Sequence, residues 1–179
     1  LITGTDEWIN YESLDEDIIN ATIAIEDRHF FDHQGFDYLR IAKAMYNNIK
    51  SGSKNEGAST ITQQYAKNLY LDFDKTWTRK INEAWLTVRL ETHYSKEEIL
   101  EGYLNTINYG GIFGVENASK YYFGKSATDL SLGESAMLAG IPNRPSEFSP
   151  FVNLEAAKKR QKVVLESMER DGYITKEQL

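Results

Sequence analysis

Apolar residues recur at helical spacing along most of the chain. Between Leu14 and Ile25 they fall at intervals of three or four positions, and the three acids Asp15 to Asp17 occupy the first turn. Acids are favoured there because the N-terminal end of a helix carries a partial positive charge. The pattern therefore predicts a helix that delivers Glu26 at its C-terminal end.

The same periodicity predicts further helices and no strand, so the expected fold class is mainly α. Ser95 followed by Glu98 is the signature of a capping box, in which each side chain accepts a backbone N–H of the other residue. Ile61, Tyr65 and Leu69 are spaced as one buried helical face. The further helices are expected at Leu39 to Ile49, Ile61 to Leu69, Arg79 to Thr92, Ser95 to Ile107, Val115 to Tyr122, Leu130 to Ile141 and Leu154 to Met168. The segment from Leu130 to Ile141 is rich in small residues, and we expect it to be central.

Other stretches lack this periodicity. Ser51 to Gly57 is rich in glycine and polar residues, which predicts a flexible loop that serves as a flap or a linker. Asn68 to Trp77 mixes aromatic and aliphatic residues with charges; we expect interior packing, and the alternative is a membrane interface, where aromatic side chains are enriched. Arg144 to Pro150 reads as a rigid irregular segment.

Composition narrows the class of protein. The chain of 179 residues is 41% hydrophobic, which supports a single domain over residues 1–179. Its net charge of -7 argues against a nucleic-acid partner, because a phosphate backbone is normally met by a basic surface. The absence of cysteine excludes disulfides, thiol nucleophiles and cysteine metal sites. No window approaches the roughly eighteen apolar residues of a membrane span, and we expect the chain to be a piece of a longer, membrane-anchored protein.

Candidate chemistry concentrates between Glu26 and Gly35, where carboxylates, an arginine, histidines and two phenylalanines follow one another. The C-terminal end of a helix disfavours negative charge, and so does burial, so Glu26 could have a raised proton affinity suited to a general base. A solvated helix end is the alternative. We expect His33 to be a structural histidine; a zinc site from His29 and His33 is a distant alternative, because the glutamate of the His-Glu-x-x-His arrangement is missing.

A second candidate site lies at Gly57 to Gln64, where a helix opens behind a glycine. Ser59 or Thr60 can cap this helix, and free backbone amides at its mouth would suit a phosphate group. A plain capped helix is the alternative. The stretch is not a Walker loop, since the Gly-Lys-Ser/Thr ending is absent.

Two helix faces carry further polar pairs. Arg79 and Glu83 are four residues apart, with the acid in the less favourable C-terminal position. We interpret Arg79 and Lys80 as an anion site beside a second carboxylate; the alternative is a surface salt bridge, worth about a few tenths of a kcal/mol. Glu101 and Asn105 also share a helix face. Three interpretations are open for this pair: it supports neighbouring backbone, it binds a sugar, or it is merely exposed.

Together, separated blocks of the chain resemble the peptidoglycan glycosyltransferases of family 51. These are the polymerase modules of class A penicillin-binding proteins and their monofunctional relatives. In the family's order, the blocks are Glu26 to Gly35, Gly57 to Gln64, Arg79 to Glu83, Lys96 to Asn105 and Arg144 to Pro150, each without a gap. Relatives often carry a proline near Leu14 to Asp17, and this chain does not.

The resemblance implies a lysozyme-like fold, with a large lobe and a smaller, membrane-proximal jaw lobe on either side of a cleft. The implied reaction polymerises lipid II into β-1,4 glycan strands with inversion at the anomeric carbon and release of undecaprenyl diphosphate. It takes place on the extracytoplasmic face of the bacterial plasma membrane, and a transpeptidase domain is expected in the full-length chain. Inhibition by moenomycin, a phosphoglycolipid that occupies the donor site, is implied as well.

The resemblance also implies residue roles. Glu26 is the general base that takes the proton from the 4-hydroxyl of the acceptor N-acetylglucosamine, whose oxygen attacks C1 of the donor's N-acetylmuramic acid. Fixed cations stabilise the charge of the departing diphosphate; the candidates are Lys67, Arg79 and Lys80. Glu83, a second catalytic carboxylate, holds those cations or helps to bind Mg2+ or Mn2+.

Other residues are expected to position the substrate or to shape the cleft. Thr60, Gln63 and Gln64 are candidates to position diphosphate or sugar. The cleft-shaping candidates are Asp27, Arg28, Phe30, His33, Ser59, Glu101, Tyr103, Asn105 and Arg144. The rival hypotheses are a lytic peptidoglycan hydrolase, which has no need of cations around a leaving diphosphate, and a non-catalytic module that binds lipid II or the cell wall.

Overall fold

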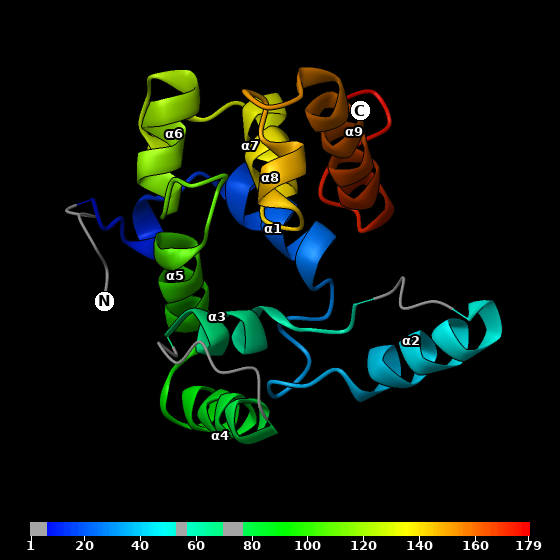
Figure 1. Cartoon of the computed structure of the whole chain (residues 1–179). Coiled ribbons are helices and arrows are strands. Elements are labelled where there is room, and N and C mark those ends of the chain that lie inside the picture. The colour runs from blue at the N-terminus through cyan, green and yellow to red at the C-terminus, as the bar shows by residue number, and fades with distance from the viewer. Residues whose placement is uncertain (1–6, 53–56, 70–76) are drawn as a thin grey trace.

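The computed structural model of the chain describes residues 7–52, 57–69 and 77–179. Within these ranges the structure is helical, and its β-structure is limited to an isolated bridge between Asn108 and Phe113. The mainly α prediction is confirmed (Figure 1). The elements are η1 (Tyr11–Ser13), α1 (Glu16–Glu26), α2 (Tyr38–Ser51), α3 (Ile61–Leu69), α4 (Trp77–His93), α5 (Lys96–Thr106), α6 (Val115–Phe123), η2 (Ala127–Asp129), α7 (Leu132–Gly140), α8 (Pro145–Phe148) and α9 (Leu154–Arg170).

Local capping sets several of the helix starts. The Asp15 carboxylate accepts the backbone N–H of Asp17 at the start of α1. The predicted capping box of α5 is present, because Ser95 accepts from the backbone of Glu98 and Glu98 accepts from the backbone of Ser95. These bonds satisfy amides that the first turn of a helix leaves without an intrahelical partner.

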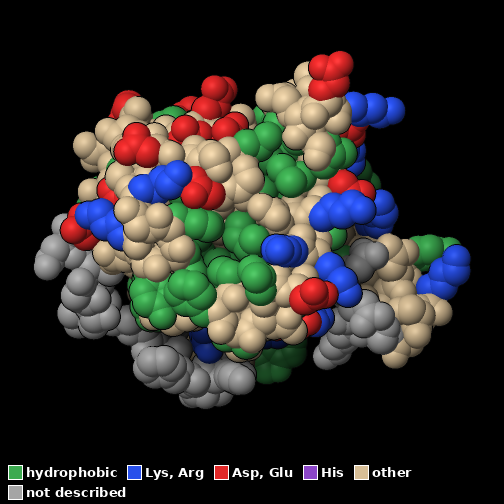
Figure 2. Space-filling view, turned by 90° about the horizontal axis from the view of Figure 1, so that it is seen from above, with side chains coloured by type: hydrophobic (Ala, Val, Ile, Leu, Met, Phe, Trp, Pro, Cys, Tyr) green, Lys and Arg blue, Asp and Glu red, His purple; other side chains and the backbone are tan. Residues whose placement is uncertain are grey.

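The large lobe is built around α1. Helices α7 and α9 both pack against α1 and against each other. Most of α1 is buried, and small residues of α7, such as Ala136, Ala139 and Gly140, allow this close packing. The prediction that Leu130 to Ile141 is central is confirmed. Acidic and basic side chains both occur on the face of the protein seen from above, with hydrophobic side chains between them (Figure 2).

Helices α2, α3 and α4 lie below this lobe in Figure 1, and α3 packs against both α4 and α5. Helix α2 buries only Ala44, and its apolar side chains are exposed. Helix α4 buries Leu90 and packs Leu86 against the core, but it also carries exposed apolar side chains. The exposed apolar residues are Tyr38, Leu39, Met45, Tyr46 and Ile49 on α2 and Trp77, Ile81, Trp85 and Val88 on α4.

The predicted buried face of α3 is only partly correct. Ile61 is fully buried and Tyr65 packs against the core, whereas Leu69 is 41% exposed at the end of the helix. Much of the predicted loop at Ser51 to Gly57 and most of Asn68 to Trp77 lie outside the described residues. No helix in the described ranges is long and apolar enough to cross a membrane.

Candidate active site

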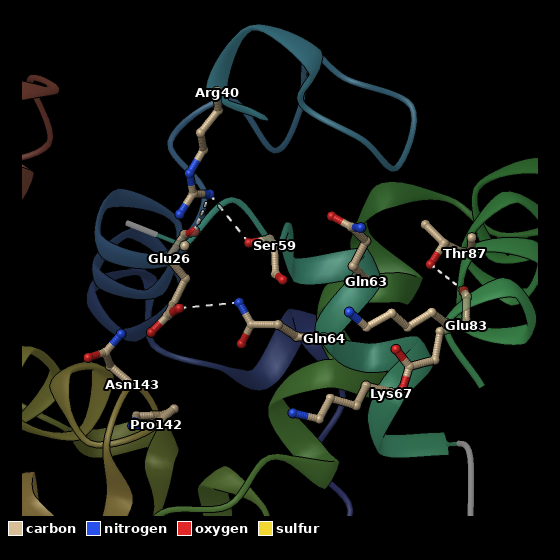
Figure 3. A pocket seen from close by; sticks show the side chains of 13 residues that line it. Glu26, Arg40, Ser59, Gln63, Gln64, Lys67, Glu83, Thr87, Pro142 and Asn143 are labelled. Carbon is tan, nitrogen blue, oxygen red and sulfur yellow. Dashed lines mark hydrogen bonds between the residues drawn. The ribbon is translucent and has the colours of Figure 1, made fainter. Parts of the chain in front are cut away.

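A cavity of about 520 Å³ lies between Glu26 and the turn after α7 on one side and helices α2, α3 and α4 on the other. It collects side chains from α1, α2, α3 and α4 and from the turn after α7 (Figure 3). The lining residues are Glu26, Arg40, Gly57, Ser59, Gln63, Gln64, Lys67, Lys80, Glu83, Ala84, Thr87, Pro142 and Asn143. Of the residues expected to act on substrate, Glu26, Gln63, Gln64, Lys67, Lys80 and Glu83 are therefore brought together.

Glu26 is the last residue of α1, and only 8% of its surface is exposed. Gln64 Nε2 donates to Glu26 Oε2 over 3.3 Å, while the buried Oε1 has no hydrogen-bond partner among the described residues. Burial raises the pKa of Glu26, and the hydrogen bond from Gln64 and the charges of Arg160 and Arg40 lower it in part. A carboxyl group with a raised pKa in a cavity has the properties of a proton acceptor in catalysis.

The amide of Gln64 is itself held in place. Tyr103 is fully buried, and its hydroxyl donates to Gln64 Oε1 over 3.0 Å. This bond leaves the amide nitrogen of Gln64 directed at Glu26. Tyr103, predicted to shape the cleft, thus acts on the carboxylate through Gln64.

Arg40 on α2 was not found from the sequence. Its Nη1 donates to the backbone oxygen of Glu26 over 3.0 Å and to that of Ser59 over 3.4 Å. The guanidinium therefore ties the end of α1 to the segment that precedes α3. The sequence offered no signal beyond a basic residue on the polar side of a predicted amphipathic helix.

The other side of the cavity is cationic. Lys67 of α3 and Lys80 of α4 line it together with Glu83, and both lysines are exposed. Arg79 does not line the cavity: its Nε lies 3.0 Å from Glu83 Oε1. The salt bridge considered as an alternative is therefore present, and it fixes Glu83 beside Lys80 rather than adding Arg79 to the lining.

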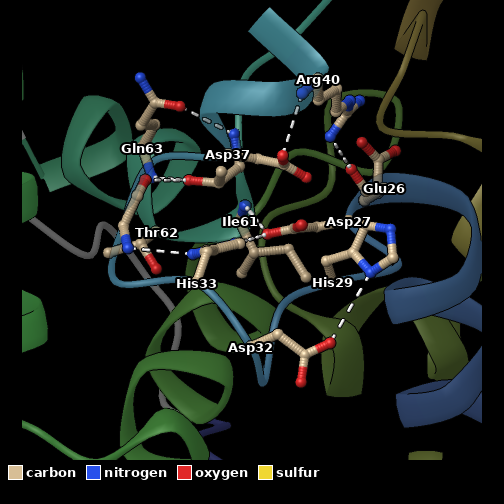
Figure 4. A network of polar contacts seen from close by, with 12 residues as sticks. Glu26, Asp27, His29, Asp32, His33, Asp37, Arg40, Ile61, Thr62 and Gln63 are labelled. Atoms are coloured by element: carbon tan, nitrogen blue, oxygen red, sulfur yellow. Dashed lines mark hydrogen bonds and ion pairs between the residues drawn. The ribbon is translucent and has the colours of Figure 1, made fainter.

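Asp27 and His33 form a buried scaffold behind Glu26 (Figure 4). His33 Nε2 donates to Asp27 Oδ2 over 2.6 Å, and His33 Nδ1 accepts the backbone N–H of Gly35 over 2.9 Å. Both ring nitrogens are satisfied, which confirms the structural histidine. Gly35 has a φ of 103°, a conformation that favours glycine, so this turn requires it.

The N-terminus of α3 is capped rather than open. Asp27 Oδ2 accepts the backbone N–H of Ile61, and the Thr60 hydroxyl accepts that of Gln63. Gln63 Oε1 accepts the backbone N–H of Thr60 in return, and the Thr60 hydroxyl donates to Gly35 O. Side chains therefore occupy the amides of Ile61 and Gln63, which supports the alternative of a plain capped helix. Thr60 is fully buried and lies outside the cavity lining.

Glu101 and Asn105 support backbone, one of the alternatives considered for them. The Asn105 side chain accepts the N–H of Ile9 and donates to the carbonyl oxygen of Ile9. Glu101 Oε1 accepts the N–H of Tyr11 and Oε2 accepts the indole N–H of Trp8. The pair anchors the segment that leads into α1.

The remaining cleft-shaping candidates, apart from Ser59, lie around the first cavity rather than in its lining. Arg28 pairs with Asp171 over 3.0 Å. Phe30 is fully buried, with the ammonium of Lys96 4.7 Å from its ring centre. Arg144 is exposed and pairs with Glu147, whereas Ser59 lines the cavity.

A second cavity of about 500 Å³ adjoins the first. The two share Glu26, Arg40 and Gly57. The second is lined by further basic side chains, namely Arg28, Lys43 and Arg170. Glu26 therefore lies between two cavities that both carry positive charge.

The described residues contain no group of three or more histidines, acids or cysteines that could hold a metal ion. His33 is bound to Asp27, and His29 Nδ1 lies 3.7 Å from Asp32. The zinc alternative has no support in this part of the chain. Glu83 is the carboxylate available beside the lysines of the first cavity.

Comparison with known proteins agrees with this geometry. A family model described as "Transglycosylase" matches residues 3–169. The chain is 56% identical to penicillin-binding protein 2D of Bacillus subtilis over 94% of this chain and 24% of that protein. It is 44% identical to penicillin-binding protein 1A of Aquifex aeolicus over 96% of this chain and 24% of that protein. The chain spans about a quarter of the length of these curated relatives.

A solved structure shows the same fold. The crystal structure of penicillin-binding protein 1A from Haemophilus influenzae matches with a TM-score of 0.55 at 24% identity. The match covers 96% of this chain and 16% of that one. The expected arrangement of two lobes on either side of a cleft is in agreement with this likeness.

Proposed function

The chain belongs to the transglycosylase family, and we propose that it polymerises lipid II into β-1,4-linked glycan strands with inversion and release of undecaprenyl diphosphate. The observation that carries this proposal is the position of Glu26, a desolvated carboxylate that separates two cationic cavities. A transfer between two lipid-linked diphosphates needs a base at the centre and positive charge on both sides. The site offers both.

Glu26 is the base in this proposal. Its raised pKa strengthens it as a proton acceptor, and the bond from Gln64 fixes one carboxylate oxygen. The other oxygen, Oε1, is left to accept the proton of the acceptor's 4-hydroxyl. As that proton leaves, the hydroxyl oxygen forms its bond to C1 of the donor sugar, and the bond from C1 to the diphosphate breaks.

Inversion places the attacking oxygen and the leaving group on opposite faces of the donor sugar. The donor's diphosphate fits the first cavity, where Lys67 and Lys80 oppose its developing charge. The acceptor fits the second cavity, whose basic side chains suit its own diphosphate. Arg79 contributes by holding Glu83 in the wall of the first cavity.

A divalent cation stays a prediction. A site made by the protein alone is not supported by the described residues. Mg2+ is commonly held by one or two carboxylates together with substrate phosphates, so Glu83 would hold Mg2+ or Mn2+ only alongside the diphosphate.

The membrane partner is proposed from the exposed apolar side chains of α2 and α4. Trp77, Trp85 and Ile81 are each more than 60% exposed, and α4 also supplies Lys80 to the cavity. Tryptophan is enriched at membrane interfaces. A substrate with a lipid tail would meet the cavity at such a surface, on the extracytoplasmic face of the plasma membrane. A transpeptidase domain in the full-length protein is proposed from its penicillin-binding relatives.

Incubation of the purified chain with lipid II in detergent tests the function. We expect strands that lengthen with time and are blocked by moenomycin; shortening of preformed strands would indicate a hydrolase, and binding without turnover a binding module. Glu26→Gln should abolish polymerisation while lipid II binding persists. The matched control is Glu166→Gln, an exposed glutamate on α9. Polymerisation by Glu26→Gln would contradict the assignment of the base.

A further inference from the structure

Two arginines in the wall of the second cavity share a single carboxylate. Arg28 follows the end of α1, Arg170 is the last residue of α9, and both line the cavity. Asp171, the residue after α9, lies outside the lining, and only 10% of its side chain is exposed. The C-terminal ends of α1 and α9 both point toward α2, which contributes Arg40 and Lys43 to the same cavity (Figure 1).

The carboxylate of Asp171 fixes both guanidinium groups. Arg170 Nε donates to Asp171 Oδ1 over 2.9 Å and Arg170 Nη2 donates to Oδ2 over 3.0 Å, which makes a bidentate pair. Arg28 Nη2 lies 3.0 Å from the same Oδ1. Arg170 Nη2 also donates to the backbone oxygen of Ala24 in α1 over 3.4 Å. The network therefore joins the end of α9 to α1 and holds both guanidinium groups at the cavity.

Both arginines keep binding capacity for an anion. Their side chains are 49% exposed at Arg28 and 48% exposed at Arg170. A guanidinium has five N–H donors, and the bonds to Asp171 and Ala24 use only some of them. Two positive charges stand against one carboxylate, so the group of three side chains carries a net positive charge.

Stability alone explains this arrangement poorly. Exposed salt bridges stabilise a fold only weakly, and Arg170 by itself already pairs with both oxygens of Asp171. Adding Arg28 to the same carboxylate brings two like charges close together. An anion bound between the two arginines would offset their repulsion.

The acids in the lining of the second cavity are already engaged. Asp27 is buried and bound to His33, and Asp37 caps the start of α2. Glu26 is shared with the first cavity, where Gln64 donates to it. The arginine pair thus faces a cavity in which Lys43 and Arg40 add further positive charge.

We infer that Asp171 is a positioning residue that holds Arg28 and Arg170 as a paired site for a phosphate group in the second cavity. The inference rests on the proposed function only in naming the acceptor's diphosphate as the group that binds. Although Asp171 is negative, it strengthens anion binding in this role, because it orients two guanidinium groups at once.

Titration with inorganic pyrophosphate tests the inference without enzyme activity. The Nε–H signals of Arg28 and Arg170 are followed by NMR and are assigned by their loss in Arg28→Gln and Arg170→Gln. In the unmodified chain we expect both signals to shift and to saturate together. In Asp171→Asn the Kd should rise about tenfold, as for the loss of one charge-assisted hydrogen bond. Signals that do not shift, or that shift without saturating, overturn the inference.

The sign of the effect separates positioning from simple charge. Asp171→Asn makes the chain more positive, so Coulomb attraction alone predicts tighter binding of pyrophosphate. Glu177→Gln makes the same change of charge at an exposed position near the C-terminus and should leave the Kd unchanged. Equal or tighter binding in Asp171→Asn overturns the inference.

The mobility of the two guanidinium groups is a measurement that needs no change at Asp171. NMR relaxation of the Nε–H signals should show both groups to be more rigid than that of Arg144, whose side chain is 67% exposed and pairs with Glu147 through one nitrogen. Equal mobility overturns the inference, also where Asp171→Asn does not fold. Circular dichroism checks folding, which we expect to persist because the backbone N–H of Asp171 ends α9 and is kept in the variant.

Polymerisation of lipid II supplies the last readout. In Asp171→Asn the KM should rise about tenfold with kcat little changed, because the arginines bind the acceptor away from the reacting atoms. A fall in kcat with an unchanged KM overturns the inference. Failure of the unmodified chain to polymerise counts instead against the proposed function, and the pyrophosphate titration then decides the inference by itself.

Discussion

The two sides of the site differ in how they are built. Glu26 lies within the packed helices of the large lobe, with Asp27 and Tyr103 buried around it. Lys67 and Lys80 lie on exposed helix surfaces of α3 and α4. The difference fits the proposed roles: a base gains proton affinity from desolvation, whereas lysines proposed to receive a lipid diphosphate must be reachable and charged. Substitutions on the buried side should therefore change folding and ionisation, and substitutions on the exposed side should change turnover.

The largest effect should come from the buried scaffold. Asp27→Asn keeps one oxygen but weakens the bonds to His33 and to the backbone N–H of Ile61, so we expect a loss of about 3 kcal/mol in the free energy of unfolding. Urea unfolding measures it. Asp32→Asn is the control, since that side chain is 81% exposed. A similar, small loss of unfolding free energy in both variants would contradict the contrast between the buried and the exposed side of the site.

Substitution of an exposed cavity lysine should reduce turnover without lowering the stability of the folded chain. Lys67→Met removes a charge that opposes the leaving diphosphate, and we expect kcat/KM to fall about a hundredfold. Steady-state kinetics with lipid II measures it, with Lys176→Met, exposed near the C-terminus, as the control. The urea midpoint of Lys67→Met should stay at that of the unmodified chain. An unchanged kcat/KM would remove Lys67 from the proposed role.

The ionisation of Glu26 should cost stability. Its pKa is raised in the folded chain, so its contribution to stability is present at pH below the unfolded pKa and is lost as pH rises through the folded value. Glu26→Gln removes the charge, and we expect the variant to be more stable by about 1 kcal/mol at neutral pH. Thermal unfolding between about pH 4 and pH 7 checks that the difference shrinks in acid. A less stable variant at neutral pH would contradict the assignment of a desolvated carboxylate.

The smallest effect should be on membrane contact. Replacing Trp85 and Ile81 of α4 by serine removes exposed apolar surface, and binding to liposomes with anionic lipid should weaken about several-fold. Co-sedimentation measures it. Tyr121→Ser, which changes an exposed aromatic residue on α6, is the control. Equal weakening in the control would argue against a membrane-facing surface on α4.

Much of the helical structure was predictable because it depends on local spacing. The helix that ends at Glu26, the capping box of Ser95 and the central position of α7 follow from residues a few positions apart. The cavity residues Gln64 and Lys80 were predictable for a different reason, since they fall in the blocks that resemble the family, and Lys67 lies just beyond one of these blocks. At the N-terminus of α3 the sequence identified Thr60 as a cap, but it did not show that Asp27, from a distant part of the chain, occupies the amide of Ile61.

What the sequence by itself determined is most of the helices, with α8 in the segment expected to be irregular as the exception, and the choice of Glu26 as the candidate base. Only the tertiary structure decided which charges lie near Glu26. In the sequence, the helix faces that carry Arg40 and Arg160 cannot be distinguished from solvent-exposed polar faces. Only the tertiary structure also decided that the apolar side of α2 is exposed while α1 is buried. Helical periodicity predicts that a face is apolar, but what covers that face depends on contacts between segments far apart in the chain. The raised pKa of Glu26 also depends on such contacts, because the neighbours that pack around a carboxyl group remove it from water.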